Sequence, residues 1–165
     1  MPEERTCGGC TACCKTHGVA ELKKPSGTIC THCDPGSGCR VYSKRPQACR
    51  TYKCSWLIGL GLPEYRPDKV GVVPDHVDIP GLGIALWLYE VKSGKFLSKF
   101  ARRQTRLNLE VGNAVLHVPT VGRAKLFVPE NKWDPELEFR FGDSKQRVVV
   151  IRAVPEMFSE PAVHI

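Results

Sequence analysis

The sequence predicts an α+β protein: a metal-stapled, loop-rich N-terminal cysteine module, followed by a small, mostly antiparallel sheet packed with one amphipathic helix. Three observations predict it. All nine cysteines lie between positions 7 and 54. Segments rich in β-branched and aromatic residues, bounded by Gly or Pro, recur after Gly61. One later stretch has helical periodicity. We therefore expect a cysteine module over residues 1–60 and a small α+β domain over residues 61–165.

The composition is that of a globular chain. It has 165 residues, of which 42% are hydrophobic and 25% charged. The N-terminus lacks the apolar core of a secretory signal, and the longest mainly apolar run, Gly81 to Val91, is far shorter than the roughly 20 residues that cross a bilayer. We expect a cytoplasmic protein that does not enter a membrane. Stable disulfides are uncommon in the reducing cytosol, and nine thiols cannot all pair, so metal ligation is the favoured interpretation.

The first cysteines form two overlapping Cys-x-x-Cys units, Cys7 to Cys10 and Cys10 to Cys13. This spacing lets a tight turn aim two sulfurs at one centre, and the two glycines after Cys7 allow backbone amides to approach them. The triplet also matches the opening of a bacterial ferredoxin cluster run, but Cys14 follows at once. A fourth ligand must therefore come from elsewhere in the chain.

The remaining cysteines supply such ligands. Cys30 and Cys33 form another Cys-x-x-Cys pair, and Cys39, Cys49 and Cys54 follow at wider spacing. Nine cysteines suffice for two four-sulfur sites with one left over, or for one site with spare thiols. The expected cofactor is zinc or an iron–sulfur cluster, and the triplet spacing favours a four-iron cluster slightly.

Two histidines, His17 and His32, lie within the cysteine segment, and both are expected to be solvated loop residues rather than ligands. Turn sequences predict that residues 15–40 are looped. Pro46 is suited to begin a helix that Gly59 or Gly61 ends. In that helix the inward stripe would consist of Cys49, Tyr52, Trp56 and Leu60.

The basic charge is concentrated beside the cysteines. Residues 1–60 hold nine Lys and Arg against four acidic residues, so +5 of the net +7 lies there. A four-thiolate site with a divalent metal, or with a four-iron cluster in its 2+ state, carries a formal charge of about −2. We therefore interpret the basic residues as compensation for thiolates rather than as a phosphate-binding surface.

These residues carry a resemblance. Cys7-x-x-Cys-x-x-Cys-Cys14, Cys30, Cys39-Arg-Val-Tyr42 and Arg45-Pro-Gln-Ala-Cys49-Arg-Thr-Tyr-Lys-Cys54-Ser-Trp56 resemble the YkgJ-like cysteine-cluster family of zinc- or iron-chelating CxxCxxCC domains. The likeness covers about residues 7–57 and implies metal or iron–sulfur binding through eight cysteines, with Cys33 outside the pattern. The segment also resembles part of the flagellin lysine methylases, whose relatives carry an iron–sulfur cluster.

The second part is predicted to contain one helix, at about Lys95 to Val111. Its apolar side would consist of Phe96, Phe100, Leu107 and Val111, and its basic side of Lys95, Lys99, Arg102 and Arg106. A solvated surface is the favoured interpretation of the basic side, with binding of nucleic acid or an acidic protein as the alternative. The expected strands are Lys69–Val73, Ile84–Val91, Ala114–Val118, Ala124–Val128, Glu136–Phe141 and Arg147–Val154.

No independent catalytic motif is present. Gly81-Leu-Gly83 lacks the third glycine and following helix of a dinucleotide fingerprint. His76 is expected in a polar loop and His117 in a structural role. The preferred hypothesis is a metal-binding protein with a structural or electron-handling role, whose α+β domain is a scaffold or docks a protein partner. The alternatives are an accessory component or enzyme in methyl-transfer or redox chemistry, and a zinc-dependent nucleic-acid-binding protein.

Overall fold

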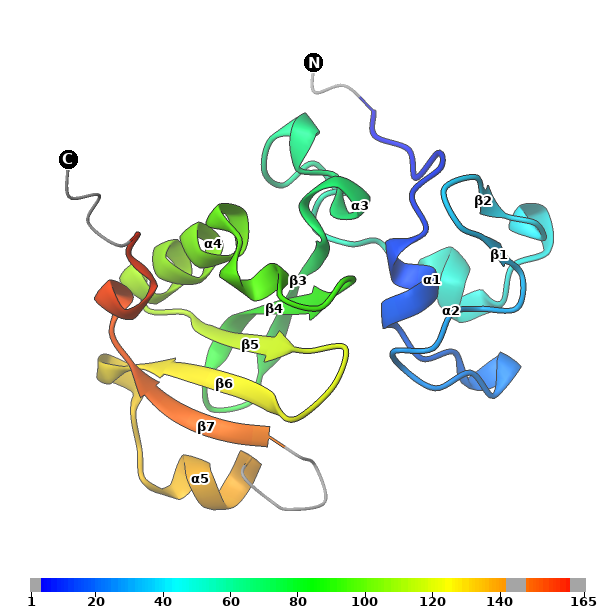
Figure 1. The fold of residues 1–165 in the computed structure, drawn as a ribbon. Coiled ribbons are helices and arrows are strands. Elements are labelled where there is room, and N and C mark those ends of the chain that lie inside the picture. The colour runs from blue at the N-terminus through cyan, green and yellow to red at the C-terminus, as the bar shows by residue number, and fades with distance from the viewer. Residues whose placement is uncertain (1–3, 142–147, 161–165) are drawn as a thin grey trace.

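The computed structural model describes residues 4–141 and 148–160. It shows a mixed α+β fold in which the cysteine-bearing segment lies beside a five-stranded sheet (Figure 1). The cysteine-bearing segment is mostly irregular, as the turn sequences predicted. Its regular elements are short: α1 Ala12–Thr16, η1 Ala20–Leu22, β1 Cys33–Asp34, β2 Gly38–Cys39, η2 Tyr42–Lys44, α2 Gln47–Thr51 and η3 Pro63–Tyr65.

A helix was expected from Pro46 to Gly59 or Gly61, and this prediction is wrong beyond the first turn. Pro46 caps α2, but the helix ends at Thr51 and Tyr52 is extended. The chain turns there because tertiary contacts replace helical ones: the Ser55 amide donates to Pro74 O at 3.1 Å. Trp56 is buried as expected, whereas Leu60 is exposed.

The large sheet contains β3 Val72–Ile79, β4 Gly83–Glu90, β5 Ala114–Val118, β6 Ala124–Pro129 and β7 Val148–Ala153, hydrogen-bonded in that order. The pairs β3/β4 and β5/β6 are antiparallel, and the pairs β4/β5 and β6/β7 are parallel. The sheet is therefore mixed, and the expectation of a mostly antiparallel sheet is wrong. Each parallel pair needs a crossover connection, and helices α4 Lys99–Glu110 and α5 Glu136–Phe141 supply them.

The strands expected at positions 84, 114 and 124 are confirmed to within about one residue at either end, as β4, β5 and β6. The first strand is displaced: the expected segment starting at Lys69 is occupied at first by α3 Pro67–Val70, and Gly71, with φ of +80°, ends that helix. The strand β3 then continues through His76, which is paired with Leu86 rather than placed in a loop. Pro74 is tolerated because β3 is an edge strand.

The segment Glu136–Phe141 is a helix, α5, and not the expected strand. Its N-terminus is held by Asp134, whose carboxylate accepts a hydrogen bond from the Glu136 amide at 2.9 Å. Leu137 is buried against the sheet. The last expected strand, Arg147–Val154, is found as β7, and its first residue, Arg147, lies outside the described residues.

The central helix α4 begins later than expected, because residues Lys95–Leu97 form the separate turn η4 and Ser98 caps the helix through a bond from the Ala101 amide, 3.2 Å long. Its buried residues are Ala101, Thr105 and Leu109. Leu107 and Val111, which were expected to face inward, are exposed.

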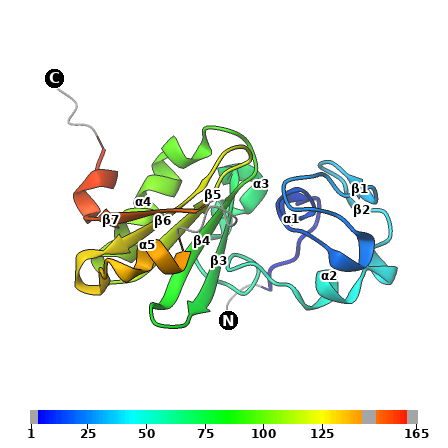
Figure 2. The ribbon, with the colours of Figure 1, turned by 90° about the horizontal axis from the view of Figure 1, so that it is seen from below.

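The two helices cover opposite faces of the sheet (Figure 2). One core cluster contains Ala101 and Leu109 of α4, and the other contains Leu137 of α5. Several cations of α4 have partners within the chain: Lys99 pairs with Glu160, Arg106 pairs with Glu110, and Arg102 donates to Ser159 O after the turn η6 Pro155–Phe158. No helix of the described residues combines the length and apolar character of a membrane span.

A buried carboxylate joins two loops at the end of the sheet. Glu90, which is 6% exposed, accepts hydrogen bonds from the Lys95 amide at 2.9 Å and from the Thr120 amide at 3.1 Å. The Thr120 hydroxyl also lies 3.3 Å from the same carboxylate. These donors satisfy the hydrogen-bonding capacity of the Glu90 side chain in the interior.

Candidate metal centre

Eight of the nine cysteines line one cavity of about 340 Å³ in the N-terminal segment. They are Cys7, Cys10, Cys13, Cys14, Cys30, Cys39, Cys49 and Cys54. Cys33 is not among the lining residues, and its side chain is buried beside them. The cysteines that carry the family resemblance are thus gathered on one concave surface, and Cys33, outside that pattern, lies behind it in hydrogen-bond contact with Cys14.

Tight turns bring the first cysteines to the cavity. The Cys10 amide donates to Cys7 O at 2.8 Å, which closes the first Cys-x-x-Cys turn, and α1 carries Cys13 and Cys14. Gly9 is needed for close packing at this turn, because a Cβ there would lie 2.5 Å from Gly36 O. The loop that leads to β2 can therefore approach the turn only while position 9 has no side chain.

Later cysteines are held by contacts over long sequence distances. The Cys30 amide donates to Cys14 O at 3.0 Å, so the second cysteine group is tied to α1. Cys49 lies on α2, whose N-terminal amides of Gln47 and Ala48 donate to the Glu21 carboxylate at 2.8 and 3.2 Å. A carboxylate at a helix N-terminus is favourable, and it fixes α2 against the loop of η1.

The five-stranded sheet packs against the cysteine-bearing segment and supports it. His17 packs between the rings of Tyr52 and Tyr89, with centroid separations of 4.4 and 4.3 Å. The Lys15 ammonium donates to Val91 O at 2.6 Å, and the Ser55 amide donates to Pro74 O. The floor of the cavity is therefore anchored on β3 and β4.

The charged residues that line the cavity are all basic among the described residues: Lys24, Arg45, Arg50 and Lys53. Lys24 is only 9% exposed and donates to the carbonyls of His17 and Pro25. Burial lowers the pKa of Lys24, and the charges of Cys30 and Cys14 oppose that effect. The charge of Lys24 in turn opposes the rise in the pKa of Cys14, which a hydrogen bond with Cys13 and burial cause.

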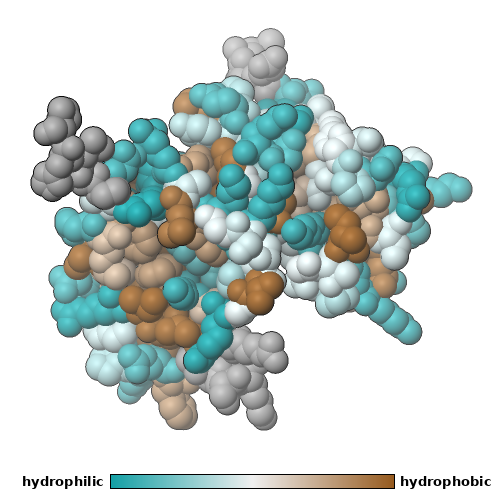
Figure 3. Space-filling view, viewed as in Figure 1, coloured by the Kyte–Doolittle hydropathy of each residue, from teal (hydrophilic) through white to brown (hydrophobic). Residues whose placement is uncertain are grey.

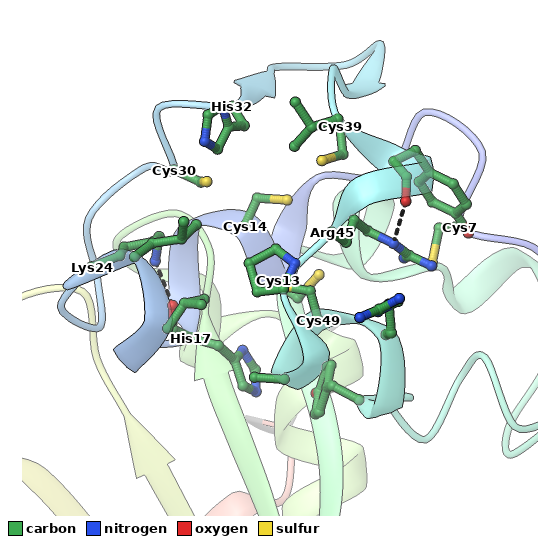
Figure 4. Close-up of a pocket in the computed structure, with 18 of the residues that line it drawn as sticks. Cys7, Cys13, Cys14, His17, Lys24, Cys30, His32, Cys39, Arg45 and Cys49 are labelled. Carbon is green, nitrogen blue, oxygen red and sulfur yellow. Dashed lines mark hydrogen bonds between the residues drawn. The ribbon is translucent and has the colours of Figure 1, made fainter.

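Arg45 is oriented toward Cys7. Its guanidinium lies over the Tyr42 ring at 3.6 Å, and its Nε donates to Tyr42 O at 3.0 Å. Figure 4 shows the guanidinium extending toward Cys7. Burial raises the pKa of the Cys7 thiol, and the charge of Arg45 lowers it.

Burial is the main cause of the raised pKa of several thiols, including Cys10, Cys49 and Cys54. A hydrogen bond with Cys13 raises the pKa of Cys14 still more, followed by burial. The pKa of Cys33 rises to about 11, mainly through burial. For these thiols the protonated form is favoured, and binding of a metal cation would have to displace the protons.

The sulfurs form two overlapping neighbourhoods, which are linked because the charge of Cys14, after burial, also contributes to the raised pKa of Cys7. Charges on Cys14, Cys30 and Cys39 each contribute to the raised pKa of Cys49. Figure 4 shows the side chains of Cys14, Cys30 and Cys39 directed toward a common space.

Cys54 belongs to the other neighbourhood, because charges on Cys10 and Cys7 contribute to its raised pKa. Within residues 4–141 and 148–160, however, no three Cys, His, Asp or Glu side chains form a group that could hold a metal ion. The sulfurs share a cavity without converging on one point.

Both histidines line the cavity. His32 lies above Cys30 and Cys39 (Figure 4), while the His17 ring reaches toward the sheet and packs on Tyr89. Burial lowers the pKa of His17 to about 4. His17 was expected to be solvated, and it is instead half-buried, with its Nδ1 2.7 Å from the Thr16 hydroxyl.

Sequence reasoning singled out the cysteines but not Lys24 or Glu21, which support them. The overall excess of basic residues was the only signal for Lys24, and nothing local indicated that Glu21 would cap α2. Comparisons of the chain with protein-family models, curated proteins and solved structures find no match. The likeness to the YkgJ-like family therefore stays a resemblance carried by residues 7–57.

Proposed function

We propose that this chain is a metal-binding protein that holds zinc or an iron–sulfur cluster through cysteine thiolates, with a structural or electron-handling role. The observation that supports it is one cavity lined by eight thiols and four cations, with no carboxylate among its described lining residues. Soft sulfur donors suit zinc and iron–sulfur centres, whereas the oxygen donors preferred by magnesium and calcium are missing from this set.

The eight thiols divide into two sets of four in this proposal. Cys14, Cys30, Cys39 and Cys49 form the first set, since the charges of the first three all act on the fourth. Cys7, Cys10 and Cys54 form the second set, since the charges of Cys10 and Cys7 act on Cys54, and the action of Cys14 on Cys7 puts the two sets side by side.

Cys13 is assigned to the second set by elimination, and its hydrogen bond with Cys14 then joins the two sets. It is adjacent to Cys14 on α1, and both residues line the cavity. In this proposal Cys13 and Cys14 therefore bind different centres. Cys33 is in hydrogen-bond contact with Cys14 but does not line the cavity, so it is left out of both sets.

Charge supports two centres. Each four-thiolate centre carries a formal charge of about −2, so two would carry about −4. The four lining cations, Lys24, Arg45, Arg50 and Lys53, would balance that charge. Without such cations, closely spaced thiolates in a partly buried cavity would repel one another strongly.

When bound, zinc would crosslink the loops, and a four-iron cluster would accept or donate an electron. The residues of the chain have separate tasks. Glu21 and Gly9 position the loops that carry the thiols. Lys24 and Arg45 lower the electrostatic cost of ionised sulfurs. β3 and β4 provide the rigid support.

The test is metal and acid-labile sulfide content of anaerobically prepared protein, measured for the wild type and for each Cys→Ser variant. Each of the eight cavity-lining variants is expected to lower metal content, and Cys33→Ser is expected to keep it as the matched control. A variant of one set should lower the occupancy of its own centre more than that of the other centre. Reduced protein that takes up neither zinc nor iron during anaerobic reconstitution would refute the proposal. An equal loss in Cys33→Ser would refute the division of the cysteines.

A further inference from the structure

A second cavity, of about 430 Å³, lies apart from the cysteines, between η4, β5, β6 and η6. No cysteine lines it. Its size lies within the range of about 300–1,000 Å³ that is usual for small-molecule sites. It is therefore large enough for a ligand and independent of the metal centre.

Four aromatic rings form one wall of this cavity. Phe96 stacks on His117 at 4.3 Å between centroids with 14° between planes, and Phe127 meets Phe158 edge to face at 4.9 Å. His117 and Phe127 are 4.8 Å apart, which makes the wall continuous. A flat or flexible apolar group would gain both burial and aromatic contact against it.

The orientation of His117 follows from its hydrogen bonds. The single hydroxyl proton of Thr105 is donated to Ala101 O at 2.9 Å, so Thr105 Oγ1 acts as acceptor toward His117 Nε2 at 2.8 Å. The Nε2–H tautomer leaves the lone pair on Nδ1. Because burial lowers the pKa of His117 to about 4, the ring is neutral and adds no charge to the wall.

Three cations line the same cavity: Arg102, Arg123 and Lys125. No acidic residue is among the described residues that line it. Arg102 donates to Ser159 O, but its Nε is buried without a hydrogen-bond partner. A buried, unpartnered guanidinium nitrogen is costly and is relieved by an acceptor.

The edge of the cavity is apolar. Leu97, Val121 and Met157 are 78%, 86% and 51% exposed, although all three are large apolar residues. Figure 3 shows apolar atoms gathered over β6 and β7, bordered by hydrophilic ones. An exposed apolar edge around a cavity with cations suits a ligand that is itself amphipathic.

We propose that this cavity binds a small amphipathic anion, whose apolar body lies against Phe96 and Phe158 and whose carboxylate or phosphate faces Arg102, Arg123 and Lys125. The body would be the size of one aromatic ring with a short chain, or of a short acyl chain. The site does not depend on the metal-binding proposal, because the cavities share no residue.

The test uses probes with one apolar body and different head groups: phenylbutyrate, phenylbutanol and phenylbutylamine, with phenylbutyl phosphate as a second anion. Binding to the full-length chain is followed by amide shifts in ¹H–¹⁵N NMR. We expect saturable shifts on β5, β6 and η6 with an anion, and binding of phenylbutyrate that is tighter than that of the alcohol or the amine. Comparison of the two anions identifies the preferred head group.

The matched variants are the double substitution Arg123→Gln with Lys125→Gln, and Arg103→Gln as a control on the exposed side of α4. The double variant is expected to weaken phenylbutyrate binding about tenfold, since it removes two charged donors, and the control is expected to leave it unchanged. Equal binding of anion, alcohol and amine would overturn the proposal. So would unchanged affinity in the double variant, shifts elsewhere in the chain, or no binding of either anion.

Discussion

His117 should make the protein less stable as the pH falls, because its surroundings oppose protonation of the ring. The ring is 5% exposed, stacks on Phe96 and donates to Thr105. Burial, followed by the charge of Lys125, lowers its pKa from the ordinary 6.5 to about 4. Arg102 and Arg123 line the same cavity, so the charged groups around the ring all oppose its protonation.

The sign follows from the folded-state pKa lying below that of the unfolded chain. As the pH falls, the unfolded chain binds a proton at His117 before the folded protein does. The stability contributed by neutral His117 is therefore complete above about pH 6.5 and is lost progressively down to about pH 4. At about 1.4 kcal/mol per pH unit, the full difference is about 3 kcal/mol. Between about pH 7 and about pH 5 the loss is about 2 kcal/mol.

The perturbation is His117→Gln, and the assay is urea unfolding followed by tryptophan fluorescence at several pH values. The wild type is expected to lose about 2 kcal/mol more than the variant between about pH 7 and about pH 5. Contributions from His17, whose pKa is also lowered to about 4, are common to both proteins and cancel. If the two proteins lost stability in parallel, the assignment of a neutral, buried His117 would be refuted.

Three further substitutions test the metal site and the fold. Lys24→Met should weaken zinc affinity about tenfold in a competition titration, whereas Lys23→Met, at the exposed neighbouring position, should not; equal effects would exclude a specific role for Lys24. Glu90→Ala should lower the free energy of unfolding by about 2 kcal/mol because it leaves buried donors unpaired, while Glu110→Ala at a surface pair should cost about 0.5 kcal/mol or less. Gly9→Ala should reduce metal content, since the added Cβ meets a backbone oxygen; wild-type metal content would show that the loop adjusts.

The parts of the fold that the sequence predicts well are those with one dominant pattern. β4 and β5 are apolar runs between turn residues, and both lie where periodicity places them. β3 was hidden by Pro74 and by its polar residues Asp75, His76 and Asp78, which resemble a loop unless the strand is known to lie at an edge. The helix α5 was misread as a strand, although Asp134 followed by Pro135 is a helix-start signal that could have identified it.

Where long-range contacts decide the structure, local pattern fails. Cys49, Tyr52 and Trp56 recur at helical spacing, yet the bond from Ser55 to the edge strand ends the helix early. The gathering of the cysteines in one cavity agrees with their spacing. Their division into neighbourhoods, and the burial of Lys24 among them, depends on how separate loops fold back, which no local signal encodes.

The support of the cysteine loops by β3 and β4 has a consequence during synthesis of the chain. Residues 7–54 leave the ribosome before Val91, whose carbonyl anchors Lys15, and before Tyr89, which packs on His17. At roughly 5–20 residues per second, the delay between Cys54 and Val91 is about 2 to 7 s. During that interval the thiols have no scaffold and are open to oxidation or to capture of a wrong metal. If the proposed metal binding holds, ordered loading follows translation of the sheet, and a nascent chain stalled before Val91 would present the thiols without the contacts from Val91 and Tyr89 that support their loops.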